Sequence, residues 1–223
     1  MKPLVYLIYQ FLILILMPFF FIRLWIKGKK LASYRERWLE RLGFVSPKVK
    51  SKLKAKIKPK IKNQNIIWFH AVSVGESMAA SILVKGLLEK DKSEDLFILI
   101  TTMTPTGADQ VERLFKDNKK VAHHYLPYDF KFCLANFINK IKPKVCVIME
   151  TELWPMLLAE CCKKKVKVIM ANARLSEKSF RNYKRFGKLT LWMLKDISMI
   201  FARSKQDEIF FKSLGVSENN ISV

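Results

Sequence analysis

The sequence is poor in the residues that build metal sites and disulfide frameworks. It contains four cysteines and three histidines in 223 residues. No two cysteines form a Cys-x-x-Cys pair and no histidine stands at ligand spacing from a cysteine, which excludes a zinc site or a disulfide scaffold as the organising feature. The cysteines fit a reducing cytosol, and we expect neither a metal nor a cofactor.

Acidic residues are also scarce, with 19 Asp and Glu against 41 Lys and Arg, and the net charge is +22. A surplus of this size predicts association with a polyanion, either nucleic acid or an anionic bilayer. Half of the residues are hydrophobic, which excludes a disordered chain. The length suits one large domain or two small ones.

Residues 4–22 contain no charge and are just long enough to span a hydrocarbon core. Basic residues follow this stretch closely, whereas only Lys2 precedes it, so the positive-inside bias predicts that the rest lies in the cytosol. A cleaved signal peptide is not favoured, because no small-residue cleavage pattern follows. Pro18 would kink a spanning helix, so spanning and in-plane anchors both stay open.

Lysine occupies every second position in residues 48–62. We interpret this stretch as a flexible connector near anionic lipid, each lysine contributing about 1 kcal/mol at most, or as a merely solvated tether. It lacks interleaved aromatics, so nucleic acid is not an expected partner. We therefore divide the chain into a membrane anchor (1–27), a basic juxtamembrane segment and linker (28–64), and a domain (65–223).

From residue 65 onward, short apolar runs alternate with helical patterns, which predicts an α/β fold with a Rossmann-like parallel sheet. The expected strands are residues 66–69, 96–101, 124–126, 145–149, 166–171 and 199–202. The expected helices are residues 76–90, 107–115, 129–141, 154–164, 179–194 and 205–214. Residues 221–223 resemble the start of another strand, so we expect either a partner or a longer protein to complete it.

The most informative motif is H-A-V-S-V-G-E-S, residues 70–77, which joins a strand to a helix. It fixes Glu76 at the carboxyl end of a strand, where open α/β sheets bind their ligands, and a carboxylate there can accept a proton. Glu76 is therefore a candidate general base. The alternative is that Glu76 only complements the helix dipole.

Three further polar clusters follow predicted strands. The T-T-M-T-P-T-G loop offers Thr104 and Thr106 to a phosphate or a sugar, or as caps of the next helix. Glu150 and Glu152 in M-E-T-E-L-W-P have raised or split proton affinities if buried, although they could also be exposed loop acids. Arg174 in A-N-A-R-L-S could clamp a carboxylate or a phosphate.

In this order and spacing, these motifs resemble those of the Kdo transferases of lipopolysaccharide synthesis. The resemblance extends over nearly the whole chain and includes Y-L-P-Y-D, R-L-W-I-K-G and Y-R-E-R-W. It implies a GT-B glycosyltransferase with two Rossmann-like domains. The first receives the lipid A precursor lipid IVA, and the second binds the donor CMP-Kdo. The chain matches only the first, so we expect it to bind membrane and acceptor without transferring sugar by itself.

The resemblance also implies roles for the candidate residues. Glu76 would be the general base of an inverting transfer, and Glu150 would stabilise the transition state. We expect the substrate to be bound by Ser73, Gly75, Thr104, Thr106, Glu152 and Arg174. No metal or cofactor is implied, and the expected location is the cytoplasmic side of the inner membrane.

Three other functions compete with this interpretation. The runner-up is a non-catalytic, membrane-associated lipid-binding remnant. A glycoside hydrolase using Glu76 and Glu150 would release free sugar into water. A nucleic-acid binder would show salt-sensitive binding that survives deletion of the anchor and of residues 48–62.

Overall fold

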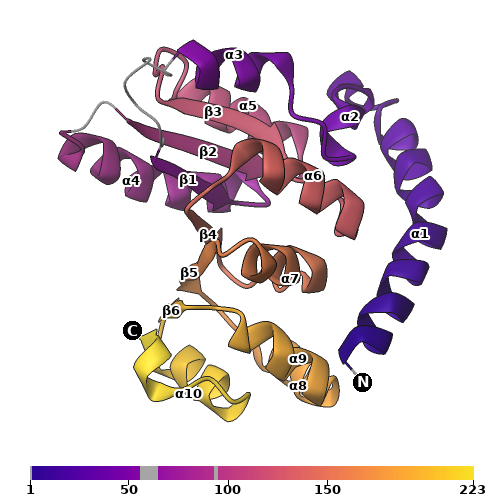
Figure 1. The fold of residues 1–223 in the computed structure, drawn as a ribbon, viewed down its shortest axis with the longest axis vertical. Coiled ribbons are helices and arrows are strands. Elements are labelled where there is room, and N and C mark those ends of the chain that lie inside the picture. The colour runs from indigo at the N-terminus through magenta and orange to yellow at the C-terminus, as the bar shows by residue number, and fades with distance from the viewer. Residues whose placement is uncertain (1, 56–64, 93–94) are drawn as a thin grey trace.

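The computed structural model describes residues 2–55, 65–92 and 95–223. Its centre is a seven-stranded sheet in which every pair of neighbouring strands is parallel, in the order β3-β2-β1-β4-β5-β6-β7 (Figure 1). The strands are β1 Asn65–His70, β2 Leu96–Thr102, β3 Val121–Tyr125, β4 Val145–Met149, β5 Lys167–Ala173, β6 Met199–Ala202 and β7 Ile221–Ser222. The α/β prediction is confirmed.

Helices cover both faces of this sheet, and each face has its own apolar core. The core under α6 and α7 contains Trp68, Phe97 and Phe137, whereas the core under α4 and α5 contains Phe69 and Ile98. The principal helices of the domain are α4 Val74–Lys90, α5 Pro105–Leu114, α6 Lys131–Ile141, α7 Pro155–Lys163, α8 Glu177–Arg185, α9 Gly187–Lys195 and α10 Lys205–Ser213. The side chains of successive residues in one strand pack into opposite cores, which explains why β1 and β2 are almost continuously apolar.

The strand order reverses beside β1. From β1 the chain proceeds to β2 and β3 on one side, then returns to place β4 on the other side of β1. The connections after β1 and β4 therefore leave in opposite directions and flank a crevice at the carboxyl edge, which is where open α/β sheets bind ligands. The fold thus places the loops after β1 and β4 at the expected position of a site.

Several element boundaries differ from the sequence prediction. β4 and β6 have the predicted bounds, but β3 begins at Val121, three residues early. The single helix expected over residues 179–194 is two helices, α8 and α9, because Gly187 adopts a positive φ of 26° at their junction. Residues 221–222 form β7 and pair with β6, so the last predicted strand is also present.

The lysine-rich stretch is not a flexible connector in its first part. Pro47–Ala55 forms helix α3, with Val49 fully buried and Leu53 packed against the same core. Lys52 donates hydrogen bonds to the carbonyl oxygens of Val121, at 2.7 Å, and Asn118, at 3.2 Å, and so covers the free edge of β3. The rest of that stretch, residues 56–62, lies outside the described residues. Positions 49 and 53 have the i, i+4 spacing of one helix face, but the lysine at every second position obscured this helical pattern in the sequence.

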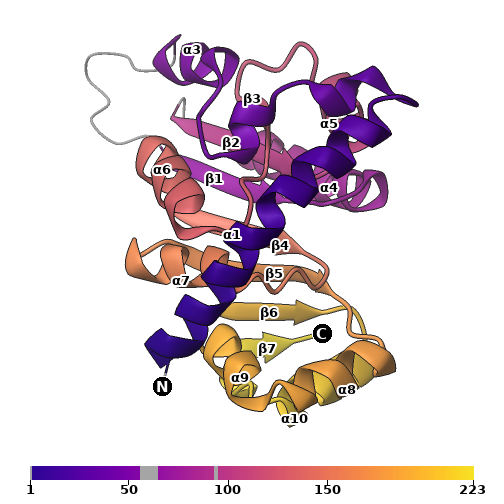
Figure 2. The ribbon, with the colours of Figure 1, turned by 90° about the vertical axis from the view of Figure 1, so that its right-hand side faces the viewer.

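Helix α1 (Lys2–Lys27) lies along the face of the domain formed by α6 and α7 (Figures 1 and 2). Its residues Leu4–Lys27 are long and apolar enough to cross a membrane by length and composition. Two short elements, η1 (Ala32–Arg35) and α2 (Trp38–Arg41), connect it to α3. The apolar helix expected at the N-terminus is therefore present.

Candidate active site at the carboxyl edge of the sheet

Glu76 and Ser73 form a reciprocal capping arrangement at the start of α4. Ser73 is the N-cap, and its hydroxyl donates to Glu76 Oε1 at 2.8 Å while it accepts a longer bond, 3.5 Å, from the Glu76 amide. The backbone amide of Val72 donates to the other carboxylate oxygen at 2.8 Å. Both carboxylate oxygens are thereby fixed.

Burial makes this carboxylate more basic than an ordinary glutamate. Glu76 is only 7% exposed. Desolvation raises its pKa, the hydrogen bonds from Val72 and Ser73 lower it, and the nearby charge of Glu150 raises it. Glu76 therefore combines a fixed orientation with a raised proton affinity, which are the two properties that a general base requires.

Glu150 directly follows β4 and has a left-handed backbone, with φ of 56°. Its amide donates to the carbonyl of Ala171 at 3.0 Å, so the unusual conformation is held by β5. A non-glycine residue in this region costs on the order of 1–3 kcal/mol, and such residues concentrate at functional sites. The conformation begins the turn that carries both acids of the loop after β4.

Glu152 is the most strongly perturbed acid of the edge. Its Oε2 accepts a 2.7 Å hydrogen bond from Trp154 Nε1. Desolvation, with smaller contributions from Glu76 and Glu150, raises its pKa to about 7. The charge of Glu150 raises the pKa of both Glu76 and Glu152, and the charge of Glu76 raises that of Glu152, so the structure brings together three acids that are separated by up to 76 positions in sequence.

The hydroxyl loop after β2 has a structural role that the sequence left open. Thr104 is the N-cap of α5, and its Oγ1 accepts a 3.1 Å bond from the Gly107 amide. Thr106 is exposed, and its hydroxyl lies 3.4 Å from that of Thr104. The cap interpretation is therefore correct for Thr104, whereas Thr106 is exposed and its hydroxyl donates to that of Thr104.

Gly75 and Arg174 are both exposed at the same edge. A Cβ atom added to Gly75 would have no neighbour within 4 Å, so the described fold does not itself require glycine there. Arg174 follows β5, and its carbonyl accepts a hydrogen bond from the Thr151 hydroxyl, which ties it to the acidic loop. The space over Gly75 lies at the start of α4, one residue before Glu76.

The sequence did not reveal how the hydroxyl loop is held. Arg37 Nη2 lies 3.0 Å from His123 Nδ1, and His123 Nε2 lies 2.9 Å from the Thr102 hydroxyl. Since Arg37 can only donate, His123 carries its proton on Nε2 and donates to Thr102. The Thr102 hydroxyl in turn donates to the carbonyl of Thr104.

A second contact comes from Arg41, at the end of α2 and three residues beyond the Y-R-E-R-W segment that contains Arg37. The side chain of Arg41 is 2% exposed and donates from Nη2 to the carbonyl of Met103 at 3.1 Å. Its guanidinium lies 4.2 Å from the ring centroid of Tyr125. The charged residues in and just after Y-R-E-R-W were the only sequence signal for these contacts, and they indicated no partner. Two arginines thus hold the loop that carries Thr104.

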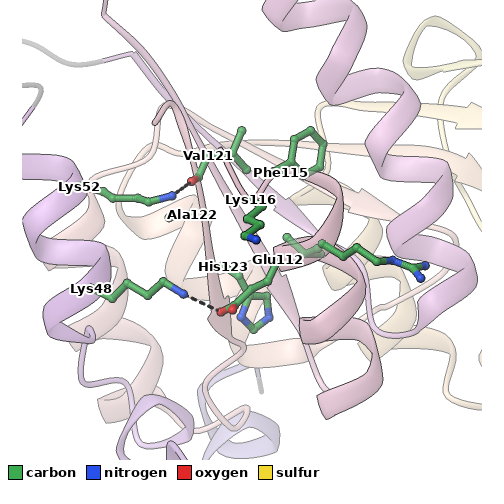
Figure 3. A pocket seen from close by; sticks show the side chains of 10 residues that line it. Lys48, Lys52, Glu112, Phe115, Lys116, Val121, Ala122 and His123 are labelled. Atoms are coloured by element: carbon green, nitrogen blue, oxygen red, sulfur yellow. Dashed lines mark hydrogen bonds and ion pairs between the residues drawn. The ribbon is translucent and has the colours of Figure 1, made fainter. Parts of the chain in front are cut away.

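A separate hollow lies between α3, α5 and β3 (Figure 3). It has a volume of about 440 Å³ and is lined by Lys48, Lys52, Lys116 and His123 among others. Lys48 pairs with Glu112 at 3.0 Å and Lys52 bonds to the β3 backbone. None of the expected site residues lines it. Within the described residues, no group of three His, Cys, Asp or Glu side chains is arranged to hold a metal ion.

The fold defines a Rossmann-like α/β protein, and the three edge acids form a candidate ligand site at its topological switch. Two solved structures, both described as UDP-N-acetylglucosamine 2-epimerases, share this fold with TM-scores of 0.52. One is 12% identical over 72% of this chain and 48% of its own. The other, from Listeria monocytogenes, is 16% identical over 71% of this chain and 44% of its own. Identities this low show the fold alone.

The sequence itself identifies the family. The profile of the 3-deoxy-D-manno-octulosonic-acid transferases (kdotransferases) matches residues 36–223. A 3-deoxy-D-manno-octulosonic acid transferase of Haemophilus influenzae is 34% identical over 96% of this chain and 47% of its own length. One of Rickettsia bellii is 32% identical over 94% of this chain and 46% of its own. The chain belongs to the Kdo transferase family and spans about half the length of these relatives.

A further relative differs in its described activity. A bifunctional glycosyltransferase/methyltransferase of Fusobacterium nucleatum is 34% identical over 72% of this chain and 24% of its own length.

Proposed function

We propose that this chain is the acceptor-binding half of a glycosyltransferase that moves Kdo from CMP-Kdo to lipid IVA, a lipid A precursor. Membership of the Kdo transferase family supports a glycosyltransferase of lipopolysaccharide synthesis. The observation that carries the proposal is the buried carboxylate of Glu76, fixed by two hydrogen bonds at the switch-point edge beside Glu150 and Glu152. The chain corresponds to the first Rossmann-like domain of a GT-B enzyme.

In this mechanism, Glu76 accepts the proton of the acceptor sugar hydroxyl as that oxygen attacks the anomeric carbon of Kdo. The new carbon–oxygen bond forms while the bond to CMP breaks, and CMP leaves with the electron pair. One base is sufficient because the leaving group is already activated. Glu150 stabilises the positive charge that develops on the sugar in the transition state.

The remaining residues of the edge bind and orient the acceptor. Glu152, with a pKa near 7, is partly protonated at neutral pH and donates a hydrogen bond to a sugar hydroxyl. Thr106 and Arg174 are exposed and bind a hydroxyl and a phosphate of the acceptor. Gly75 lets the sugar approach the start of α4, and Ser73 and Thr104 hold the two loops by capping their helices.

The proposed location is the cytoplasmic side of the inner membrane. Helix α1 supplies apolar surface, and the net charge of +22 favours an anionic bilayer and the phosphates of the acceptor. The donor half that binds CMP-Kdo is required for transfer, so residues 1–223 alone bind lipid IVA without transferring Kdo.

The test uses the protein as its own cell makes it, in isolated membranes supplied with CMP-Kdo and lipid IVA. We expect lipid IVA to gain the mass of Kdo, and release of CMP to depend on the acceptor. Binding of lipid IVA without any gain in mass would instead support the non-catalytic lipid-binding remnant. Free Kdo formed in the absence of acceptor would support a hydrolase, and either result would overturn the proposal.

A further inference from the structure

Helix α1 has two distinct long faces. Its less exposed residues recur with helical spacing and point to the domain, and they include Tyr6, Tyr9, Ile13, Met17, Phe20 and Leu24. The opposite face carries large apolar side chains that are 44–67% exposed, namely Leu4, Leu7, Ile8, Phe11, Leu12, Leu14, Ile15, Leu16, Phe19, Ile22, Trp25 and Ile26. A contiguous apolar face of this size marks an interaction surface.

The docked face makes specific contacts along most of the helix. The Tyr9 hydroxyl donates to the buried carboxylate of Asp129 at 2.8 Å, and Gln10 Oε1 accepts from the Lys131 amide at 3.1 Å. Further along, Phe20 and Phe21 pack on the ring of Tyr128, with centroids 5.4 and 5.5 Å away. These contacts extend over roughly 20 Å of helix at 1.5 Å per residue. The domain therefore lies beside the helix, not beyond its end (Figure 2).

This arrangement is incompatible with a helix that crosses the bilayer. A spanning helix is surrounded by lipid or membrane protein along about 30 Å, so α1 would have to leave the domain. Departure would place Tyr9 and Gln10 in hydrocarbon and remove a hydrogen bond from the buried carboxylate of Asp129, and each unsatisfied group costs several kcal/mol in lipid.

We infer that α1 lies in the plane of the membrane interface and docks the domain on the bilayer through its exposed apolar face. Two further apolar side chains are exposed on elements that contact α1: Phe132, 64% exposed, follows Lys131 on α6, and Leu39, 66% exposed, follows Trp38 on α2. Lys29 and Arg35 lie over the ring of Trp25, which sets cations at headgroup level near the C-terminal end.

The inference also places the lipid surface next to the proposed site. Tyr128, which Phe20 and Phe21 contact, follows β3 at the same carboxyl edge as the three acids. A lipid acceptor could thus keep its acyl chains in the bilayer while its sugar reaches that edge. The in-plane position itself does not depend on the proposed transfer, and its test requires no activity.

The test places a nitroxide at Leu4, Phe11, Ile15 or Ile22, one at a time, in a Cys162→Ser background, because Cys162 is the exposed cysteine of the described structure. These four positions lie within about 40° of one another on the helix. The protein is reconstituted in vesicles of phosphatidylethanolamine and phosphatidylglycerol, and label depth is measured by electron paramagnetic resonance. A label at Lys85, exposed on α4, is the matched control.

We expect all four labels to lie at one shallow depth, within about 5 Å, and the control label to contact water alone. A profile that is deepest at Phe11 and Ile15, with Leu4 and Ile22 near opposite surfaces about 27 Å apart, would establish a spanning helix and overturn the inference. Labels shielded from both lipid and water would show that a protein covers this face, which would also overturn it.

Discussion

Glu76 is oriented by the same atoms that begin helix α4. The dipole interpretation and the base interpretation of this residue are compatible, since Ser73 and Val72 both stabilise the carboxylate and fix its direction. The hydrogen bonds lower its pKa against the larger effect of desolvation. Changes to this cap should therefore alter stability and chemistry together.

We expect Ser73→Ala to destabilise the protein by about 1 kcal/mol through loss of the cap. Because the Ser73 hydroxyl favours the ionised form of Glu76, its removal raises the pKa of Glu76 further. On acidification, the variant should therefore lose transfer at a higher pH than the wild type does. The pH profile of transfer measures this shift.

The matched control for that substitution is Ser204→Ala. Ser204 caps α10 in the same way, by bonding to Asp207, at a distance from Glu76 in sequence. It should lose similar stability and leave the acid limb of the profile in place. If the acid limb of the pH profile lay at the same pH in both variants, the result would contradict the coupling of Ser73 to Glu76.

Gly75→Ala separates substrate approach from folding. The new methyl group meets nothing in the protein, and alanine favours helix over glycine by up to about 1 kcal/mol, so stability should stay equal or rise. Transfer should fall, because the methyl group occupies the space through which the acceptor approaches. Gly86→Ala, in the same helix and equally unobstructed, should stabilise the protein without this loss. Thermal denaturation and transfer assays measure the two effects, and unchanged transfer in Gly75→Ala would contradict the role.

Glu152 should make stability depend on pH. Its pKa is raised from 4.5 in the unfolded reference to about 7, so the folded state binds the proton more tightly. Its contribution is fully present below pH 4.5 and is lost as pH rises to about 7. Glu152→Gln should therefore gain stability relative to the wild type between pH 5 and pH 8, by on the order of 1–3 kcal/mol. Urea unfolding of both proteins at pH 5 and pH 8 tests this. A difference in unfolding free energy that does not change with pH would contradict the raised pKa of Glu152.

At the scale of elements, helix α7 is capped by a residue from another part of the chain. Its own N-cap residue, Trp154, makes no side-chain cap, and Asp129 accepts from the amides of Met156 and Leu157 at 3.0 and 2.8 Å. The same carboxylate accepts from Tyr9 of α1. One buried acid thus joins the loop after β3, helix α7 and the anchor helix.

We expect Asp129→Ala to destabilise the protein by about 2–4 kcal/mol, because it leaves two buried amides and one hydroxyl without an acceptor. Tyr9→Phe should cost about 1–2 kcal/mol. The double variant should be little worse than Asp129→Ala alone, since both changes remove the same contact. Additive losses in urea unfolding would contradict a direct link between α1 and the domain.

Elements with strong local patterns were predictable from the sequence. β4 and β6 are short apolar runs bounded by polar residues, and their bounds are as expected. The break between α8 and α9 depends on the backbone conformation of one glycine, and α3 depends on the edge of β3 against which it packs. Such contacts are tertiary, so periodicity could not indicate them.

At the scale of the whole molecule, parallel topology explains how much of the site the sequence could predict. The sequence predicted that Glu76, Glu150 and Glu152 follow strands, and because parallel strands end at one edge, the fold brings these three acids to the same edge. The contacts from Arg37 to His123 and from Arg41 to Met103 join residues 86 and 62 positions apart. They were not predictable because Arg37 and Arg41 precede the first strand, so no strand end fixes where they lie relative to the sheet.

The most direct test of the account is transfer of Kdo to lipid IVA by the Glu76→Gln protein in native membranes, measured together with binding of lipid IVA. We expect binding to persist and transfer to fall by at least about 100-fold, the usual contribution of a general base. Glu89→Gln, an exposed acid of the same helix, should keep full transfer. Full transfer by Glu76→Gln would contradict the role of Glu76 as the base.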